Sequence, residues 1–178
     1  MRSIDTSLLY AVALFLFFTG CDPSAPGQNE QKNNNATTQK PSLPADLFTK
    51  TTIPEAKSVL EARKEGKVGE KITITGFLGG REEPFTSNRA TFLLADISLP
   101  PCTDGCKAPW DACCETPETI AKNVATIQVA DEKGNPLKCD IKNQGGLKPM
   151  STITIEGIVS QKDDQVLVIN AQHIYVKP

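Results

Sequence analysis

Histidine is the side chain that this sequence most conspicuously lacks, with one copy in 178 residues. Methionine and tyrosine are also scarce, at two copies each. Because histidine is the side chain that ordinarily titrates near neutral pH, proton transfer would have to fall to a tuned Asp, Glu or Lys. The composition therefore predicts a non-catalytic protein, and it argues against a metal site with mixed Cys and His ligands.

An excess of charge of one sign is missing as well. The chain has 19 Lys and Arg against 21 Asp and Glu, a net charge of −2, and no basic run. Around the aromatic residues Phe77, Phe85 and Phe92, the only arginines are Arg81 and Arg89. A nucleic-acid binder needs a cationic strip to neutralise phosphates. We therefore expect no nucleic-acid partner.

The main apolar run is too short for a permanent transmembrane helix. It extends over the eleven residues from Leu8 to Phe18, which as a helix would reach only about 16 Å of a ~30 Å hydrocarbon core. Arg2 supplies a positive charge before the run, and Thr19-Gly20-Cys21 follows it. Residues 1–20 are therefore predicted to be an export signal.

The end of this signal, Phe18-Thr19-Gly20-Cys21, resembles the lipobox of bacterial lipoproteins. In that family, small residues before the cysteine admit the signal peptidase, and the lipidated cysteine becomes the new N-terminus. Phe18 departs from the usual Leu, so a simple secretory signal with an incidental cysteine remains the alternative. Acyl chains on Cys21 would anchor the protein to a membrane. Asp22 resembles an inner-membrane retention signal. We therefore expect a lipoprotein that faces the periplasm, with the inner membrane favoured over the outer.

Residues 21–46 are predicted to form the lipidated cysteine and a disordered linker. Pro, Asn, Gln, Ser and Thr dominate residues 22–45, and such a segment buries too little apolar surface to offset its backbone entropy. The predicted folded domain is residues 47–178.

Residues 47–178 carry the pattern of a small β-barrel. A helix is expected from about Thr52 to Gly66, with Pro54 in its first turn. Six short runs then have β character. Gly76 and Gly157 interrupt two of them, as expected where a strand bends around a closed barrel. We predict a mainly β, OB-like barrel of five to six strands with one or two short helices, and a β-sandwich is the alternative. The expected strands are 71–78, 91–96, 125–129, 137–141, 152–159 and 166–176.

A cysteine-rich loop, residues 100–117, is the strongest local signal. It holds Cys102, Cys106, Cys113 and Cys114 within thirteen residues. In an oxidising compartment these thiols could form disulfides, and because adjacent cysteines rarely pair, Cys102 and Cys106 would each join one member of the 113–114 pair. Four thiolates could instead hold Zn²⁺, or Cu⁺ at lower coordination number. A thiol-redox or copper-relay pair at Cys102 and Cys106 is the third interpretation.

Three further residues have a functional and a structural interpretation. Cys139 alternates with Leu137 and Ile141, which predicts a buried core thiol, with pairing to a loop cysteine as the alternative. Trp110 is expected to anchor the loop by packing on the barrel and satisfying its N–H, rather than to stack on a ligand. His173 is expected to be a surface or hydrogen-bonded residue rather than a metal ligand.

The motif from Cys106 to Cys114, CKAPWDACC, resembles the P-W-D-x-C-C mark of a group of exported bacterial proteins with an OB-like domain. Residues 125–131 and the late Thr154-Ile155-Glu156-Gly157 share the resemblance. Many of these proteins are lipoproteins, and they bring no established activity. The resemblance, over about residues 68–176, therefore implies a fold and a location and leaves the mechanism open.

Two functions follow from these expectations. The first is a membrane-anchored, non-catalytic binding or scaffolding lipoprotein with an unidentified protein or small-molecule partner and a disulfide- or metal-stabilised loop. The second is a periplasmic factor that handles Zn or Cu, or thiol electrons, through Cys102, Cys106, Cys113 and Cys114.

Overall fold

The computed structural model describes residues 41–102 and 105–178 of the chain. The predicted signal peptide, the lipobox with Cys21 and most of the predicted linker lie outside these residues. The two α-helices of the described part, α1 (Val59–Glu65) and α2 (Pro117–Asn123), have seven residues each. No helix among the described residues is long and apolar enough to cross a membrane.

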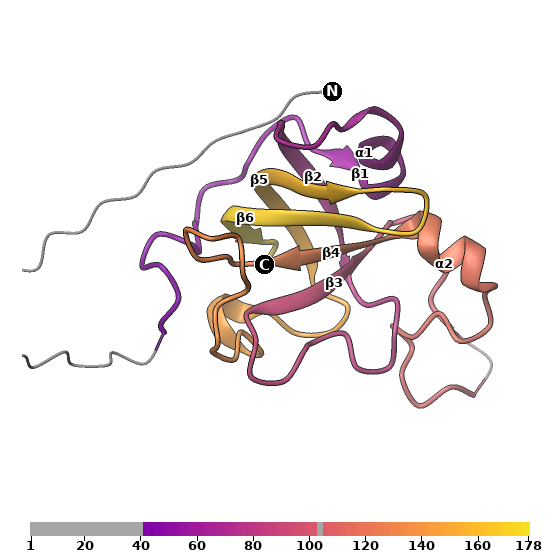
Figure 1. Ribbon diagram of the computed structural model, residues 1–178. Helices are drawn as coiled ribbons and strands as arrows, with labels where there is room; N and C mark the ends of the chain where they lie inside the picture. Colours follow the sequence, from indigo (N-terminus) through magenta and orange to yellow (C-terminus); the bar gives the residue numbers. More distant parts are fainter. Residues whose placement is uncertain (1–40, 103–104) are drawn as a thin grey trace, which may run out of the picture. The chain divides into compact units, whose positions relative to one another are not determined.

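Five strands close into a barrel (Figure 1). They are β2 (Lys71–Leu78), β3 (Thr91–Ala95), β4 (Val124–Gln128), β5 (Thr152–Lys162) and β6 (Leu167–Val176). The strand order is β2-β3-β4-β6-β5, and β5 closes the barrel on β2. The β4–β6 pair is parallel and the other four pairs are antiparallel. The prediction of a small OB-like barrel with one or two short helices is confirmed.

Alternating side chains fill the barrel. In β2, Ile72, Ile74, Gly76 and Leu78 are buried, and they alternate with residues that are exposed or partly buried. The same alternation in β5 buries Ile153, Ile155 and Val159. Side chains of successive strand residues point to opposite faces, so one face of each strand supplies the core.

Gly76 and Gly157 lie where the barrel wall turns. Gly76 stands one residue before β2 begins to pair with β3, while β2 still pairs with β5. Gly157 follows a register shift between β5 and β6. A Cβ at Gly76 would lie 2.3 Å from the carbonyl oxygen of Ala95, and one at Gly157 would lie 2.3 Å from that of Asn170. These glycines let neighbouring backbones approach closely. The register shift at Gly157 fits the bend that the sequence predicted there.

The predicted N-terminal helix begins later than expected. Helix α1 is Val59–Glu65, and the two residues before it form a short strand, β1 (Lys57–Ser58), parallel to β2. Glu55 adopts a positive φ of 57°, which a right-handed helix does not allow. The actual start signal is a capping box, in which Ser58 accepts from the Glu61 N–H and the Glu61 carboxylate accepts from the Ser58 N–H.

The prediction of a strand at 137–141 is wrong. Here the chain makes only a β-bridge between Ala130 and Pro136, then bends toward a single 3-10 turn, η1 (Gln144–Gly146). Both edges of β4 are already taken by β3 and β6, so no strand edge is left for this segment there. Ile141 is nevertheless fully buried, which accounts for the apolar pattern.

Candidate functional site: the cysteine loop

The cysteine loop connects β3 to α2 (Pro117–Asn123), on the right of Figure 1. Its base is fixed at Asp96, which is 1% exposed and directly follows β3. The Asp96 carboxylate accepts from the N–H of Leu60 in α1 at 2.9 Å and from the N–H and hydroxyl of Ser98 at 2.9 and 2.7 Å. Burial raises the pKa of Asp96, but these hydrogen bonds outweigh it, and the net effect is a lowered pKa.

Three backbone hydrogen bonds fold the loop onto itself. The Cys102 N–H donates to the Pro109 carbonyl at 3.0 Å and brings the first two cysteines back toward the second two. The Asp111 N–H donates to the Ala108 carbonyl at 2.9 Å, and the Glu115 N–H donates to the Ala112 carbonyl at 3.0 Å. The last of these closes a turn with Cys113 and Cys114 as its two central residues.

Trp110 ties the loop to the segment that follows β2. Its indole Nε1 donates to the Glu82 carbonyl at 2.9 Å, and its own carbonyl accepts from the Gly80 N–H at 2.7 Å. The ring is half-buried. Both partners belong to the segment after β2, so a residue between the two cysteine pairs is held from outside the loop.

The loop also buries apolar side chains of its own, which the sequence did not predict. Leu99 and Ala112 are 2% and 3% exposed and form a second, small core with Ala95 and Val124. Phe77, Leu93 and Ile120 pack against this cluster. The apolar residues are isolated among Pro, Gly and charged residues, so no periodic pattern identified them.

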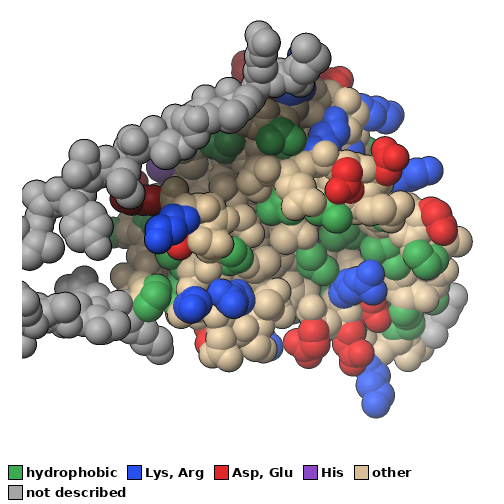
Figure 2. Space-filling model, in the orientation of Figure 1, with side chains coloured by type: hydrophobic (Ala, Val, Ile, Leu, Met, Phe, Trp, Pro, Cys, Tyr) green, Lys and Arg blue, Asp and Glu red, His purple; other side chains and the backbone are tan. Residues whose placement is uncertain are grey.

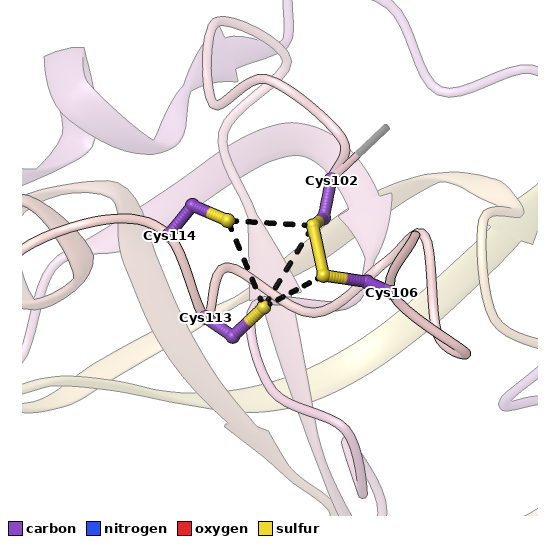
Figure 3. Close-up of side chains that lie close together, drawn as sticks. All are labelled: Cys102, Cys106, Cys113 and Cys114. Carbon is purple, nitrogen blue, oxygen red and sulfur yellow. Dashed lines mark hydrogen bonds between the residues drawn. A yellow bond between two sulfur atoms is a disulfide. The ribbon is translucent and has the colours of Figure 1, made fainter. Parts of the chain in front are cut away.

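The structure brings the four cysteine sulfurs together in one group (Figure 3). All four Sγ atoms lie within 4.8 Å of one another. Cys106 and Cys113 Sγ are 3.0 Å apart, Cys102 and Cys114 Sγ 3.5 Å, Cys102 and Cys113 Sγ 3.7 Å, and Cys113 and Cys114 Sγ 3.9 Å. These are the residues that the sequence singled out.

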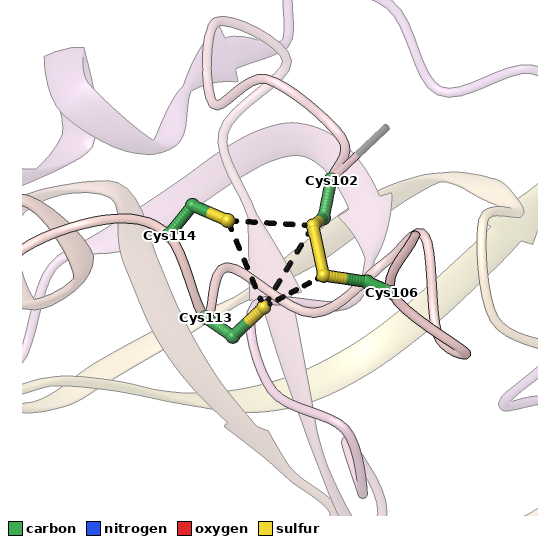
Figure 4. The surroundings of a disulfide bond; sticks show 4 residues. All are labelled: Cys102, Cys106, Cys113 and Cys114. Atoms are coloured by element: carbon green, nitrogen blue, oxygen red, sulfur yellow. Dashed lines mark hydrogen bonds between the residues drawn. A yellow bond between two sulfur atoms is a disulfide. The ribbon is translucent and has the colours of Figure 1, made fainter. Parts of the chain in front are cut away.

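Cys102 and Cys106 are joined by a disulfide (Figure 4). The expected pairing of each with a member of the 113–114 pair is therefore wrong for this structure. Their two Cα atoms are 6.1 Å apart, a normal separation for a disulfide. Cys113 and Cys114 are free thiols and are exposed.

The arrangement of the sulfurs resembles a tetrahedral thiolate site. Zn–S bonds of about 2.3 Å place the sulfurs of such a site about 3.8 Å apart. Three of the measured separations, 3.5, 3.7 and 3.9 Å, lie close to that value. Because Cys113 and Cys114 occupy the centre of a turn, the sulfurs of these two adjacent residues both lie in the group of four. Their adjacency in the sequence does not suggest this. The four cysteines could therefore bind one metal ion together, or two of them could form a disulfide.

The acid–base environment of Cys113 does not favour a reactive thiolate. Desolvation, the Cys114 thiol and the Asp111 carboxylate all raise the pKa of Cys113. Redox-active thiols usually have lowered pKa values, supplied by a cation or a helix N-terminus. A metal ion would supply the missing positive charge and displace the thiol protons.

The other singled-out side chains lie outside this group. Among the described residues, the four cysteines are the one set of three or more acidic, His or Cys side chains placed to hold a metal ion, and His173 is not part of it. His173 lies on β6, where Nδ1 is 3.3 Å from the Asp46 carbonyl. Cys139 packs partly buried against the main core, although not on the strand from which its burial was predicted.

Two cavities flank the loop and its neighbourhood. One of about 210 Å³ is lined by Cys102 and Cys114 together with Pro100, Asp111 and Ala112. The other, about 700 Å³, lies between α1, α2 and the β5–β6 turn and contains both basic and acidic side chains but no Cys, His or Ser. The visible face likewise mixes charges of both signs, without a continuous patch of either (Figure 2).

The comparisons with known proteins add no relative. No protein-family model, no curated protein and no solved structure matches this chain. The geometry of the cysteine loop therefore carries the functional argument.

Proposed function

We propose that this protein is an exported, membrane-anchored, non-catalytic module whose cysteine loop binds one Zn²⁺ ion through Cys102, Cys106, Cys113 and Cys114. The observation that supports it is the convergence of the four sulfurs within 4.8 Å of one another. Zinc is the cofactor that fits closed sites of four thiolates.

The spacing of the sulfurs favours Zn²⁺ over Cu⁺. Three of the separations between these sulfurs, 3.5, 3.7 and 3.9 Å, match the tetrahedral preference of Zn²⁺, whereas Cu⁺ is satisfied by fewer thiolates.

A closed site of this kind would stabilise the loop rather than perform catalysis. Four protein ligands leave no open coordination position for a substrate. Figure 1 places the loop on the side of the barrel opposite residues 41–50. A loop held rigid by zinc would offer a surface that a protein partner could bind.

Metal analysis of the full chain tests the zinc site. We expect one zinc ion per chain in protein purified under reducing conditions and free of added metal. Serine substitution of both Cys113 and Cys114, which are exposed, should remove most of this zinc without unfolding the barrel, and the matched control Cys139→Ala should retain it. One copper ion per chain in place of zinc would overturn the choice of Zn²⁺ as the bound metal. Reduced protein without bound metal would overturn the proposal.

A thiol-redox function is the second candidate, and one distance favours it. Cys113 Sγ lies 3.0 Å from Cys106 Sγ, which is part of the disulfide. A thiolate that close to a disulfide sulfur could exchange with it and pass electrons to a partner. Removing Cys102 would leave Cys106 without its disulfide partner, so Cys102→Ser should trap a mixed disulfide with another exported protein if this function holds. No trapped complex would exclude it.

A further inference from the structure

The zinc site and the disulfide use the same atoms. Cys102 and Cys106 each contribute the sulfur that a four-thiolate site would need, and the structure joins these two sulfurs to each other. A disulfide sulfur carries no thiolate charge, so in this state only Cys113 and Cys114 could bind a metal as thiolates. The two states therefore exclude each other.

We propose that the Cys102–Cys106 disulfide is a redox switch that turns the zinc site off, and that a dithiol turns it on by attacking Cys106. This inference rests on the proposed zinc site. It goes further by assigning the regulation of that site and the class of its reductant.

The loop requires little rearrangement between the two states. The free sulfurs of Cys113 and Cys114 already lie 3.7 and 3.5 Å from Cys102 Sγ. Trp110, held to Glu82 and Gly80, fixes the backbone between the two cysteine pairs. Breaking the disulfide would let Cys102 and Cys106 Sγ separate toward the roughly 3.8 Å that a zinc tetrahedron needs.

Burial selects the sulfur that a reductant attacks. Cys102 is 8% exposed, whereas Cys106 is partly exposed. An incoming thiolate therefore forms a bond to Cys106 Sγ, and the bond to Cys102 Sγ breaks with its electron pair leaving on Cys102. Cys102 becomes a thiolate and takes up a proton.

The second thiol of the reductant completes the exchange. It attacks its own partner sulfur in the mixed disulfide, which releases Cys106 as a thiolate and leaves the reductant oxidised to a disulfide. Two electrons and two protons have then moved from the dithiol to Cys102 and Cys106. Zn²⁺ binding displaces four thiol protons from the loop, and a disulfide oxidant reverses the sequence.

Zinc affinity in the two redox states tests the switch. The full chain, purified in detergent, is titrated with zinc against a chromophoric chelator, once after reduction by a small dithiol and once after reoxidation. We expect the oxidised protein to bind zinc roughly a hundredfold more weakly or worse, because two of four ligands are lost. Reoxidation of the zinc-loaded protein should release its zinc.

Two variants separate the switch from the site. Cys106→Ser leaves three thiolates and no loop disulfide, so we expect intermediate zinc affinity that no longer depends on redox state. Cys139→Ala should behave like the wild type in both states. Equal zinc affinity of the reduced and oxidised wild type would overturn the switch and leave the zinc site standing. No zinc binding by the reduced protein would overturn both.

The order of attack has its own test. In a Cys113→Ser/Cys114→Ser double variant the disulfide is retained and internal exchange within the loop is blocked. A small monothiol in excess should then form its mixed disulfide on Cys106, as peptide mapping by mass spectrometry would show. An adduct mainly on Cys102 would overturn the assignment of Cys106 as the attacked sulfur.

Discussion

Asp96 is the residue that joins the cysteine loop to the rest of the domain. Its carboxylate accepts hydrogen bonds from Leu60 in α1 and from Ser98 in the loop, and its own N–H donates to the Asn123 carbonyl at 2.7 Å. The sequence around Asp96 does not reveal this connecting role, because two of its hydrogen-bond partners, Leu60 and Asn123, lie 36 and 27 positions away. A single buried carboxylate thus couples α1, the loop and the end of α2.

Asp96→Ala should destabilise the fold by about 1–3 kcal/mol, because the N–H groups of Leu60 and Ser98, whose hydrogen bonds to Asp96 are partly buried, lose their acceptor. Urea denaturation of the full chain measures the difference. The matched control is Asp164→Ala, which removes an exposed carboxylate from the β5–β6 turn. A loss no greater than that of the control would contradict the role given to Asp96.

The pH dependence of the same variant follows from the lowered pKa of Asp96 in the folded state. Ionised Asp96 stabilises the fold at pH values above the ordinary carboxyl pKa of 3.8. This contribution is lost as the pH falls through the lower, folded-state pKa. The stability difference between wild type and Asp96→Ala should therefore be full at neutral pH and shrink in acid below about pH 4. A difference that grows on acidification would refute this account.

Trp110 should act on the loop with little effect on the barrel. Trp110→Phe keeps an aromatic ring and removes the donor to the Glu82 carbonyl, a hydrogen bond whose net value is about 1 kcal/mol. We expect zinc affinity of the reduced protein to fall by roughly fivefold, while the thermal unfolding midpoint of the barrel changes little. Unchanged zinc affinity would show that the loop holds its sulfurs without this anchor.

At the scale of elements, strand alternation identified most of the barrel, while the segments that depend on distant contacts escaped prediction. The alternating pattern of β2 and β5 is local, so the sequence displays it directly. The failed strand at 137–141 has the same pattern, but whether it can pair depends on the β4–β6 contact, which no local pattern records. Likewise, α1 begins at the Ser58 capping box. The sequence contains this signal, but the prediction placed the helix start earlier because of Pro54.

The candidate site divides in the same way. The clustering of four cysteines was visible in the sequence, and the structure brings the four together. The disulfide pairing of these cysteines was not visible in the sequence. It depends on backbone contacts within the loop, such as the Cys102–Pro109 hydrogen bond and the turn centred on Cys113 and Cys114. These are backbone conformations of a Pro- and Gly-rich loop that has no periodic signal.

The two barrel-corner glycines should not tolerate a methyl group. Gly157→Ala and Gly76→Ala would each push a Cβ against a neighbouring backbone carbonyl, and we expect each to destabilise the barrel by roughly 1–3 kcal/mol. Gly134→Asn is the control, because it has open space around it and a positive φ that Asn accepts. Thermal denaturation compares the three variants. Alanine variants as stable as the control would mean that the corners can relax.

At the scale of the whole molecule, the barrel separates the end where the chain enters from the loop. Residues 41–50 and the cysteine loop lie on opposite sides of the barrel in Figure 1. Residues 22–40 precede the described segment and have a composition that predicts a flexible linker.

Cys21→Ala should move the protein from the membrane fraction to the soluble periplasmic fraction, because acyl chains on this cysteine are the proposed anchor. Fractionation of the exporting bacterium, with detection of the chain in each fraction, measures the change. The loop variant Cys113→Ser should stay with the membrane and controls for general effects of losing a thiol. Retention of Cys21→Ala in the membrane would contradict lipid anchoring.

The entry of the chain into the barrel has a mechanical consequence. Leu47 is fully buried, and residues 47–49 are held to β6 by two hydrogen bonds around Ile174, of 2.7 and 2.9 Å. Tension from an anchored N-terminal part would load this short attachment first, because the β5–β6 ladder behind it is much longer. We expect these three residues to yield before any barrel strand, so that a stretched tether would lengthen at this point while the sulfurs on the far side keep their geometry.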